Sequence, residues 1–126
     1  MRPLLPLLAL AAAALAGCVK HIEAPGDRGV CWSMTQKTKT TADFHKVAVN
    51  IDTVEKCAVE LESMRTHFLG LGGTNETIVG AYQGQFLFLL PEGIFMGQTL
   101  NGGRYLLLVR SGDGRLVKPG VLPVDQ

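Results

Sequence analysis

The stretch that decides the fold is residues 78–110, which read IVGAYQGQFLFLLPEGIFMGQTLNGGRYLLLVR. From Ile78 to Leu90 the side chains alternate with a period of two, which predicts a strand. At the end of this strand both faces are apolar, as expected for a central strand that is buried by a helix. The alternation also predicts that Ile78, Gly80, Tyr82, Gly84, Phe86, Phe88 and Leu90 share one side of that strand. Gly80 and Gly84 are candidates for a bulge or a bend.

Short turns divide the rest of this stretch. Residues 91–93 and 101–103 carry the proline and glycine types typical of turns, and they separate strands expected over 94–96 and 104–110. The sequence SGDG at 111–114 predicts a hairpin that leads into residues 115–118. Turns this short can join only antiparallel neighbours, because a parallel crossover needs about a dozen residues or more. The sheet is therefore expected to be antiparallel.

Upstream of the strands, residues 52–70 predict an amphipathic helix. Asp52 and Glu55 are the residue types of the N-cap and N3 positions of a capping box, and Gly70 is a C-terminal stop. Steps of three and four define one stripe, apolar except for an arginine: Val54, Cys57, Ala58, Leu61, Met64, Arg65 and Phe68. Glu60 and Glu62 are two residues apart and are expected to be solvated on different sides of the helix.

The order of these elements predicts an α+β fold. We expect one amphipathic helix packed on a curled antiparallel sheet of four or five strands. The whole chain has 126 residues, of which 47% are hydrophobic and 18% charged, enough apolar material for one packed domain.

The N-terminus has the pattern of an export signal. Arg2 precedes an apolar run of 13 residues from Leu4 to Ala16, which is shorter than the roughly 20 residues of a membrane-spanning helix. This run ends in the sequence Leu15-Ala16-Gly17-Cys18, which closely resembles the lipobox of bacterial lipoproteins. The resemblance covers the first 18 residues only. The alternative is an ordinary secretory signal that is cut near Ala14-Leu15-Ala16, and this too would export the protein.

The resemblance implies cleavage before Cys18, alkylation of its thiol by a diacylglycerol group, and commonly a second, amide-linked acyl chain such as palmitate on the new amino group. Two or more acyl chains make a stable anchor. The residue after Cys18 is Val19 rather than aspartate, which in this family favours the outer membrane, with the protein facing the periplasm. We therefore expect a signal peptide over 1–17, a lipidated N-terminus and flexible tether over 18–29, a domain over 30–118, and a loose tail over 119–126.

With Cys18 acylated, the other two cysteines form an even pair. In an oxidising compartment Cys31 and Cys57 are expected to form one disulfide, which would join a short strand expected over residues 30–34 to the helix. Metal binding is the alternative, with His21, His45 and His67 as additional ligands, but the sequence has no CxxC, HxxxH or HExxH motif. We expect neither a metal nor a cofactor.

Motifs for catalysis are weak. Ser33, His45 and either Asp43 or Asp52 supply the residue types of a hydrolytic triad, but no serine lies in a GxSxG motif. The glycine-rich residues 70–73 follow a helix and precede a strand, which is the reverse of a phosphate-binding loop. Without Arg2 the side chains carry no net charge, which argues against nucleic acid as a partner. We therefore do not expect an enzyme.

The sequence predicts an envelope lipoprotein with a non-catalytic structural or protein-interaction role. Its lipid would bind the membrane and its domain an envelope protein. Tyr82 and Tyr105 are the candidates for a recognition surface on the sheet. The alternative function is a small-ligand or lipid binder, with a pocket lined by Phe86, Phe88, Tyr105 and Leu107.

Overall fold

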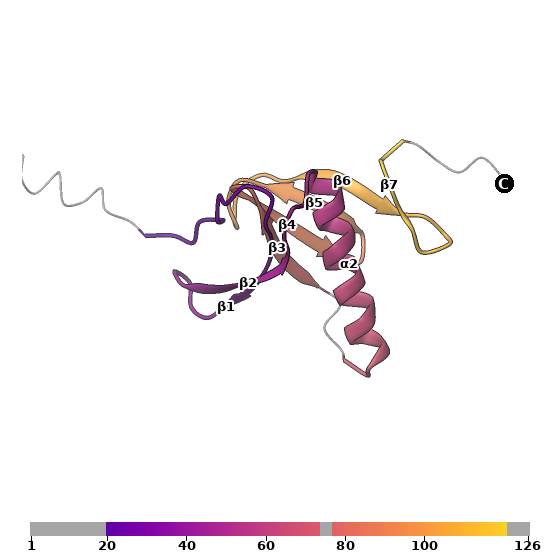
Figure 1. The fold of residues 1–126 in the computed structure, drawn as a ribbon, viewed down its shortest axis with the longest axis horizontal. Helices are drawn as coiled ribbons and strands as arrows, with labels where there is room; N and C mark the ends of the chain where they lie inside the picture. Colours follow the sequence, from indigo (N-terminus) through magenta and orange to yellow (C-terminus); the bar gives the residue numbers. More distant parts are fainter. Residues whose placement is uncertain (1–19, 74–76, 121–126) are drawn as a thin grey trace, which may run out of the picture.

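The computed structural model describes residues 20–73 and 77–120, and all structural statements below concern these residues. They form one helix and an antiparallel sheet, so the expected α+β class is confirmed (Figure 1). The expected count of four or five strands is wrong, because the sheet has seven. The strands run in the order β2-β1-β3-β4-β5-β6-β7. Their bounds are β1 Cys31–Gln36, β2 Ala42–Ala48, β3 Ile78–Tyr82, β4 Gln85–Leu90, β5 Gly93–Gly97, β6 Tyr105–Arg110 and β7 Leu116–Val117.

Two of the seven strands come from the segment expected to be a single strand. The chain turns back between Tyr82 and Gln85, and both turn residues have positive φ, 46° at Gln83 and 87° at Gly84. Positive φ at both central residues is the signature of a type I′ hairpin turn. The turn changes which side chains share a face: Leu87 and Leu89 lie on the face of Gly80 and Ile78, their partners across the hairpin. The expectation that Phe86, Phe88 and Leu90 share the side of Tyr82 is therefore wrong.

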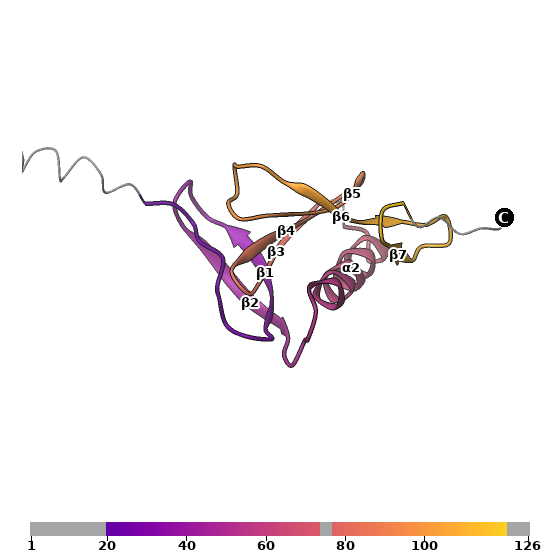
Figure 2. The same ribbon diagram turned by 90° about the horizontal axis from the view of Figure 1, so that it is seen from above.

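The helix, α2, spans Val54–Gly70 and covers one face of the sheet (Figure 2). Its N-cap is Thr53, whose hydroxyl accepts a hydrogen bond from the Lys56 N–H at 3.2 Å, so the cap lies one residue after the expected Asp52. Beyond Gly70, which was expected to stop the helix, Gly72 takes φ +94° and the Gly73 N–H donates to the Phe68 carbonyl at 3.1 Å.

The core between α2 and the sheet is tight because of one glycine. A Cβ on Gly80 would lie 2.5 Å from Leu61 Cδ1 and 2.6 Å from the carbonyl oxygen of Trp32. Gly80 therefore marks a close approach of helix and neighbouring strand rather than a bulge. The fully buried residues of this layer include Cys31, Cys57, Ala58, Leu61, Leu87, Leu89 and Ile94.

The other face of the sheet has its own apolar layer, which no helix among the described residues covers. Phe86 and Phe88 are 0% and 2% exposed, and Ile22, from the segment before β1, is 8% exposed in the same cluster. The curl of the sheet brings Met34 and Phe44 to this cluster as well. Both faces of β4 are thus buried as expected, but the second face is covered by the sheet itself and by residues near Ile22.

Candidate interaction groove

An apolar groove lies between the second half of α2 and the strands β1 and β3. It has a volume of about 520 Å³. Met64 and Phe68 form its helix side, and Ile78 and Val79 belong to its sheet side. Residues 33–36 of β1 complete the lining with Met34 and with hydroxyl and amide side chains.

The groove exists because the apolar stripe of α2 is longer than the layer it covers. A helix of 17 residues is about 25 Å long, whereas a strand of five or six residues spans about 17–20 Å. Cys57, Ala58 and Leu61 are buried, but Met64 and Phe68 are 40% and 49% exposed. The expected stripe is therefore core only in its first half, and its second half lines a groove.

The turn after α2 holds Phe68 in place. A Cβ on Gly73 would collide with the Phe68 ring, so this backbone passes directly against the aromatic side chain. The hydrogen bond from the Gly73 N–H to the Phe68 carbonyl closes the same turn. Leu71, which follows the helix, is 74% exposed and extends the apolar surface. The Phe68 ring thus forms one wall of the groove, and the exposed side chain of Leu71 lies beyond it.

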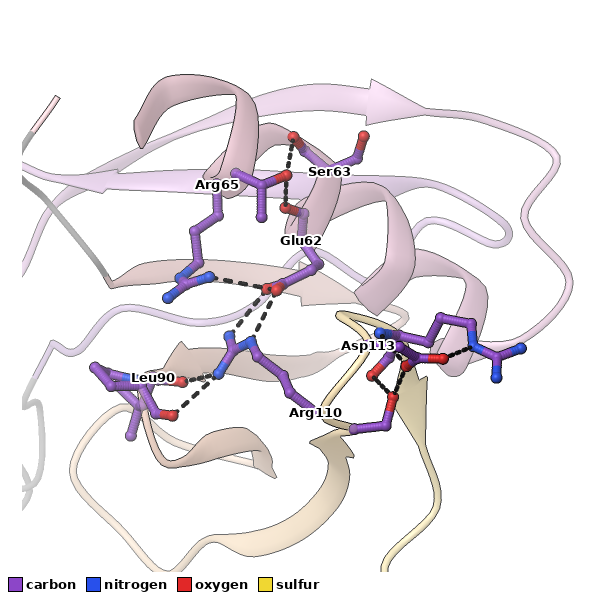
Figure 3. Close-up of polar contacts among 10 residues, drawn as sticks. Glu62, Ser63, Arg65, Leu90, Arg110 and Asp113 are labelled. Atoms are coloured by element: carbon purple, nitrogen blue, oxygen red, sulfur yellow. Dashed lines mark hydrogen bonds and ion pairs between the residues drawn. The ribbon is translucent and has the colours of Figure 1, made fainter. Parts of the chain in front are cut away.

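A buried ionic cluster of Glu62, Arg65 and Arg110 fixes α2 to the sheet (Figure 3). Both carboxylate oxygens of Glu62 accept from Arg110, at 2.8 Å from Nε and 2.9 Å from Nη2. Arg65 donates to the same carboxylate at 3.3 Å, and Arg110 also donates to the carbonyls of Leu90 and Pro91 at 2.5 and 3.2 Å. The side chains of Glu62, Arg65 and Arg110 are only 11%, 11% and 19% exposed.

This cluster corrects the expectation that Glu62 is solvated. Its carboxylate is fully engaged by two guanidinium groups, so it is a cross-link between α2, β6 and the β4–β5 turn rather than a free acid or base. Sequence reasoning missed the cluster because Arg110, the partner that buries Glu62 against the sheet, is 48 residues away in the chain. The available signal was Arg65, the one charged residue on the expected apolar stripe.

The expected cysteine pair is close together in the structure. Cys31 and Cys57 lie at disulfide distance, with Cα atoms 5.3 Å apart, and both are fully buried. The pair joins β1 to the first half of α2. Cys18, the expected lipidation site, lies outside the described residues.

The two tyrosines proposed for recognition have different environments. Tyr82 is 6% exposed, and its hydroxyl donates to the Ile51 carbonyl at 2.5 Å, so it closes the rim of the core. Tyr105 is 54% exposed, and its hydroxyl lies 3.0 Å from the sulfur of Met96. Of the two rings, that of Tyr82 is therefore buried and only that of Tyr105 is accessible on the surface.

A pocket lined by Phe86, Phe88, Tyr105 and Leu107 would favour the ligand-binding alternative, but two of these side chains are buried. Phe86 and Phe88 are buried in the second apolar layer, where the guanidinium of Arg104 lies 3.6 Å from the Phe88 ring centroid. Phe86 and Phe88 therefore fill space instead of lining a cavity.

The residues considered for catalysis come together only in part. Ser33 and His45 are directly opposite each other on β1 and β2. The two aspartates considered with them make ion pairs with lysines instead, Asp43 with Lys37 at 3.0 Å and Asp52 with Lys56 at 2.9 Å.

Residues 20–73 and 77–120 contain no group of three or more His, Cys, Asp or Glu side chains that could hold a metal ion. Within the same ranges, no helix combines the length and the hydropathy needed to cross a bilayer. Comparison of the chain with protein-family models, with curated proteins and with solved structures found no match.

Proposed function

We propose that this protein is a lipid-anchored, non-catalytic component of the bacterial envelope that binds an apolar segment of another envelope protein. The observation that carries the binding role is the groove, where Met64 and Phe68 are 40% and 49% exposed beside a cavity of about 520 Å³. Apolar side chains left in water at an ordered site are typical of interaction surfaces. Methionine suits such a surface, because its flexible side chain adapts to different apolar partners.

The size of the groove defines the kind of segment that it fits. A cavity of this volume takes a few apolar side chains and is too small for a whole protein surface. The hydroxyl and amide side chains of Ser33, Thr35 and Gln36 border it and can satisfy polar groups of the bound backbone. The partner segment is therefore a short peptide with two or three apolar anchors.

The cellular location is proposed from the leader. The lipobox resemblance at Leu15-Ala16-Gly17-Cys18 and the residue Val19 support an anchor in the outer membrane, with the domain in the periplasm. The buried pair Cys31 and Cys57, at disulfide distance, is compatible with an oxidising compartment.

A second candidate function uses the same groove. Its volume of about 520 Å³ lies within the range of about 300–1,000 Å³ for small-molecule sites. A small apolar ligand, such as a lipid fragment, would contact Met64 and Phe68 in the same way as a peptide side chain.

The anchor is tested by intact mass of the protein purified from membranes of its own host, before and after reduction. We expect the mass of residues 18–126 with acyl groups, increasing by two hydrogens on reduction of one disulfide. An unmodified mass with three free thiols would overturn both the anchor and the compartment.

The binding role is tested by photo-crosslinking in the host. A benzophenone amino acid replaces Phe68 in one variant and Glu60, which is exposed on the same helix, in the control. We expect one defined envelope protein to crosslink at position 68 and not at position 60. Crosslinks to a lipid or small molecule alone would favour the second function, and equal crosslinking at both positions would contradict a specific groove.

A further inference from the structure

The segment before β1 is fixed to the domain from Ile22 onward. Ile22 is 8% exposed and packs in the apolar layer with Phe86 and Phe88. The Pro25 carbonyl accepts from the Gly84 N–H at 2.8 Å.

Two hydrogen bonds of Gly29 hold the C-terminal end of the segment before β1. Its N–H donates to Gln83 Oε1 at 2.8 Å, and its carbonyl accepts from the Ile51 N–H at 2.9 Å. Residues 22–29, which we expected to belong to a flexible tether, are thus held at Ile22 by the apolar layer, at Pro25 by the β3–β4 turn, and at Gly29 by that turn and by the segment after β2.

This packing leaves a very short connection to the anchor. Only four residue steps separate Cys18 from Ile22, and an extended chain spans at most about 3.6 Å per residue. With lipidated Cys18 at the membrane surface, Ile22 lies within about 14 Å of it. That distance is shorter than the roughly 25 Å length of α2, so the domain cannot turn freely above the bilayer. One end of the domain must face the lipid.

The end next to Ile22 is formed by two loops. The loop between β1 and β2 is there, because Met34 and Ala42 at its base pack in the same cluster as Ile22. The loop between β5 and β6 is there too, since its Leu100 joins that cluster. Figures 1 and 2 both show the N-terminal end of the described chain beside the loop that joins β1 and β2, and β7 at the opposite end of the molecule.

This end carries more cations than carboxylates. Its exposed residues with a positive charge are Lys20, Lys37, Lys39 and Arg104. The Arg104 guanidinium packs over the Phe88 ring and donates to the Leu100 carbonyl at 3.1 Å. Its carboxylates are Glu23 and Asp43, and Asp43 is paired with Lys37. The chain without its leader has no net side-chain charge, so the excess of cations is local. An anionic surface attracts such cations only within about a Debye length, roughly 8 Å at physiological ionic strength. The short connection keeps this end close enough to the bilayer to come within that distance.

We propose that the end formed by the β1–β2 loop, the β5–β6 loop and Lys20 is a membrane-facing surface that binds anionic lipid headgroups. The proposal rests on the lipid anchor of the proposed function and adds the orientation of the domain. The opposite end, with β7 and Lys118, then points away from the bilayer.

The test compares two exposed lysines whose replacement changes the charge equally. In the full lipidated protein, Lys39→Cys and Lys118→Cys are each labelled with bimane, without reductant so that the cysteine pair is preserved. The proteins are placed in phosphatidylcholine vesicles containing one third phosphatidylglycerol and a headgroup spin-labelled lipid as quencher. We expect quenching at position 39 to exceed quenching at position 118 several-fold.

Two further variants separate the causes. A Gly-Ser insertion of twelve residues after Lys20 adds a root-mean-square span of about 17–21 Å, so the difference between the positions should largely disappear. In vesicles of phosphatidylcholine alone, quenching at position 39 should fall, and an unchanged value would overturn the role of anionic headgroups.

Flotation of the vesicles shows whether a negative result means that the proposed orientation is wrong or that the lipid anchor is absent. Protein that floats with the vesicles but is quenched equally at both positions, or more at position 118, would overturn the orientation and leave the anchor intact. Protein that fails to float would overturn the anchor, and with it the orientation.

Discussion

Replacing Glu62 with glutamine is expected to destabilise the domain strongly, although this residue lies on the surface helix. The substitution keeps the shape of the side chain and removes the charge that holds Arg110 at 2.8 and 2.9 Å and Arg65 at 3.3 Å. The amide nitrogen of glutamine is a donor, so it faces a guanidinium that is also a donor.

The size of this effect follows from burial. Breaking a buried ion pair by removing one partner costs about 3–5 kcal/mol, because the remaining charge is desolvated without compensation. Here the cost is reduced, since Arg110 is 19% exposed and keeps its bond to the Leu90 carbonyl. We expect a loss of about 2–4 kcal/mol in the free energy of unfolding, which for a domain of this size lowers the Tm by roughly 10–20 °C.

The assay is urea and thermal unfolding followed by circular dichroism, with the cysteine pair oxidised. A double-mutant cycle of Glu62→Gln with Arg110→Met isolates the pair, and a coupling of about 1–3 kcal/mol is expected. The control is Lys56→Met, which breaks the exposed pair with Asp52 and should leave unfolding close to that of the wild type. At 1 M NaCl the Debye length is about 3 Å, so any effect at Lys56 should vanish while the Glu62 effect persists.

A Glu62→Gln protein within about 0.5 kcal/mol of the wild type would refute the reasoning. The same holds for a coupling energy near zero, because the carboxylate and the guanidinium would then be independent. Either result would mean that the cluster is solvated in the folded protein.

Three further predictions concern the cysteine pair, the close approach at Gly80 and one exposed carboxyl. Cys57→Ser removes the link to Cys31 and should cost about 3.5 kcal/mol in the loop-entropy model, measured as a lower Tm; equal melting of wild type with and without reductant would contradict the disulfide. Gly80→Ala should cost about 1–3 kcal/mol in urea unfolding, because its Cβ would meet a backbone oxygen that cannot move aside. The hydrogen bond and the charge of Lys56 hold the pKa of Asp52 below its ordinary value of 3.8, so an NMR titration should give a lower pKa that rises in Lys56→Met.

The last two predictions have built-in controls. Gly112 has no atom within 4 Å of its virtual Cβ, so Gly112→Ala should stay within about 0.5 kcal/mol of the wild type, and a loss as large as that of Gly80→Ala would contradict the steric argument. For Asp52 the folded pKa is the lower one, so its contribution is present at neutral pH and is lost as pH falls through that folded pKa. Identical acid unfolding of wild type and Asp52→Asn would show that the pair contributes nothing.

Local patterns in the sequence were sufficient for the class of fold and for several elements. The steps of three and four after Asp52 predicted a helix, and the structure has it over Val54–Gly70. The sequence at 111–114 predicted a hairpin, and in the structure these residues form the turn between β6 and β7. The Ser111 N–H donates to the Arg115 carbonyl there at 2.7 Å. These features depend on residues within a few positions of one another, so the sequence contains their cause directly.

The division of residues 78–90 into two strands was harder to predict. Period-two alternation continues unbroken through the turn at Gln83 and Gly84, although the turn reverses the chain and exchanges the faces. Glycine often has a positive φ, whereas glutamine rarely does, so Gly84 was the only indication of a turn in the sequence. A single glycine in a strand is equally compatible with a bulge.

The candidate site depended on packing. The spacing of Met64 and Phe68 is that of core residues, and they line a groove only because the helix extends past the layer it covers. Glu62 was expected in solvent and is buried because Arg110, 48 residues later, lies beneath it.

The sequence by itself thus determined the α+β class, the position of the helix and the candidate cysteine pair, since each follows from local spacing or from residue type. The tertiary structure decided which half of the apolar stripe is core, which carboxylate is buried, and that Ile22 packs against the sheet. The physical reason is that a side chain becomes buried only when a second surface packs against it. A side chain is removed from water by residues far away in the chain, and their approach is fixed only when the whole sheet has formed.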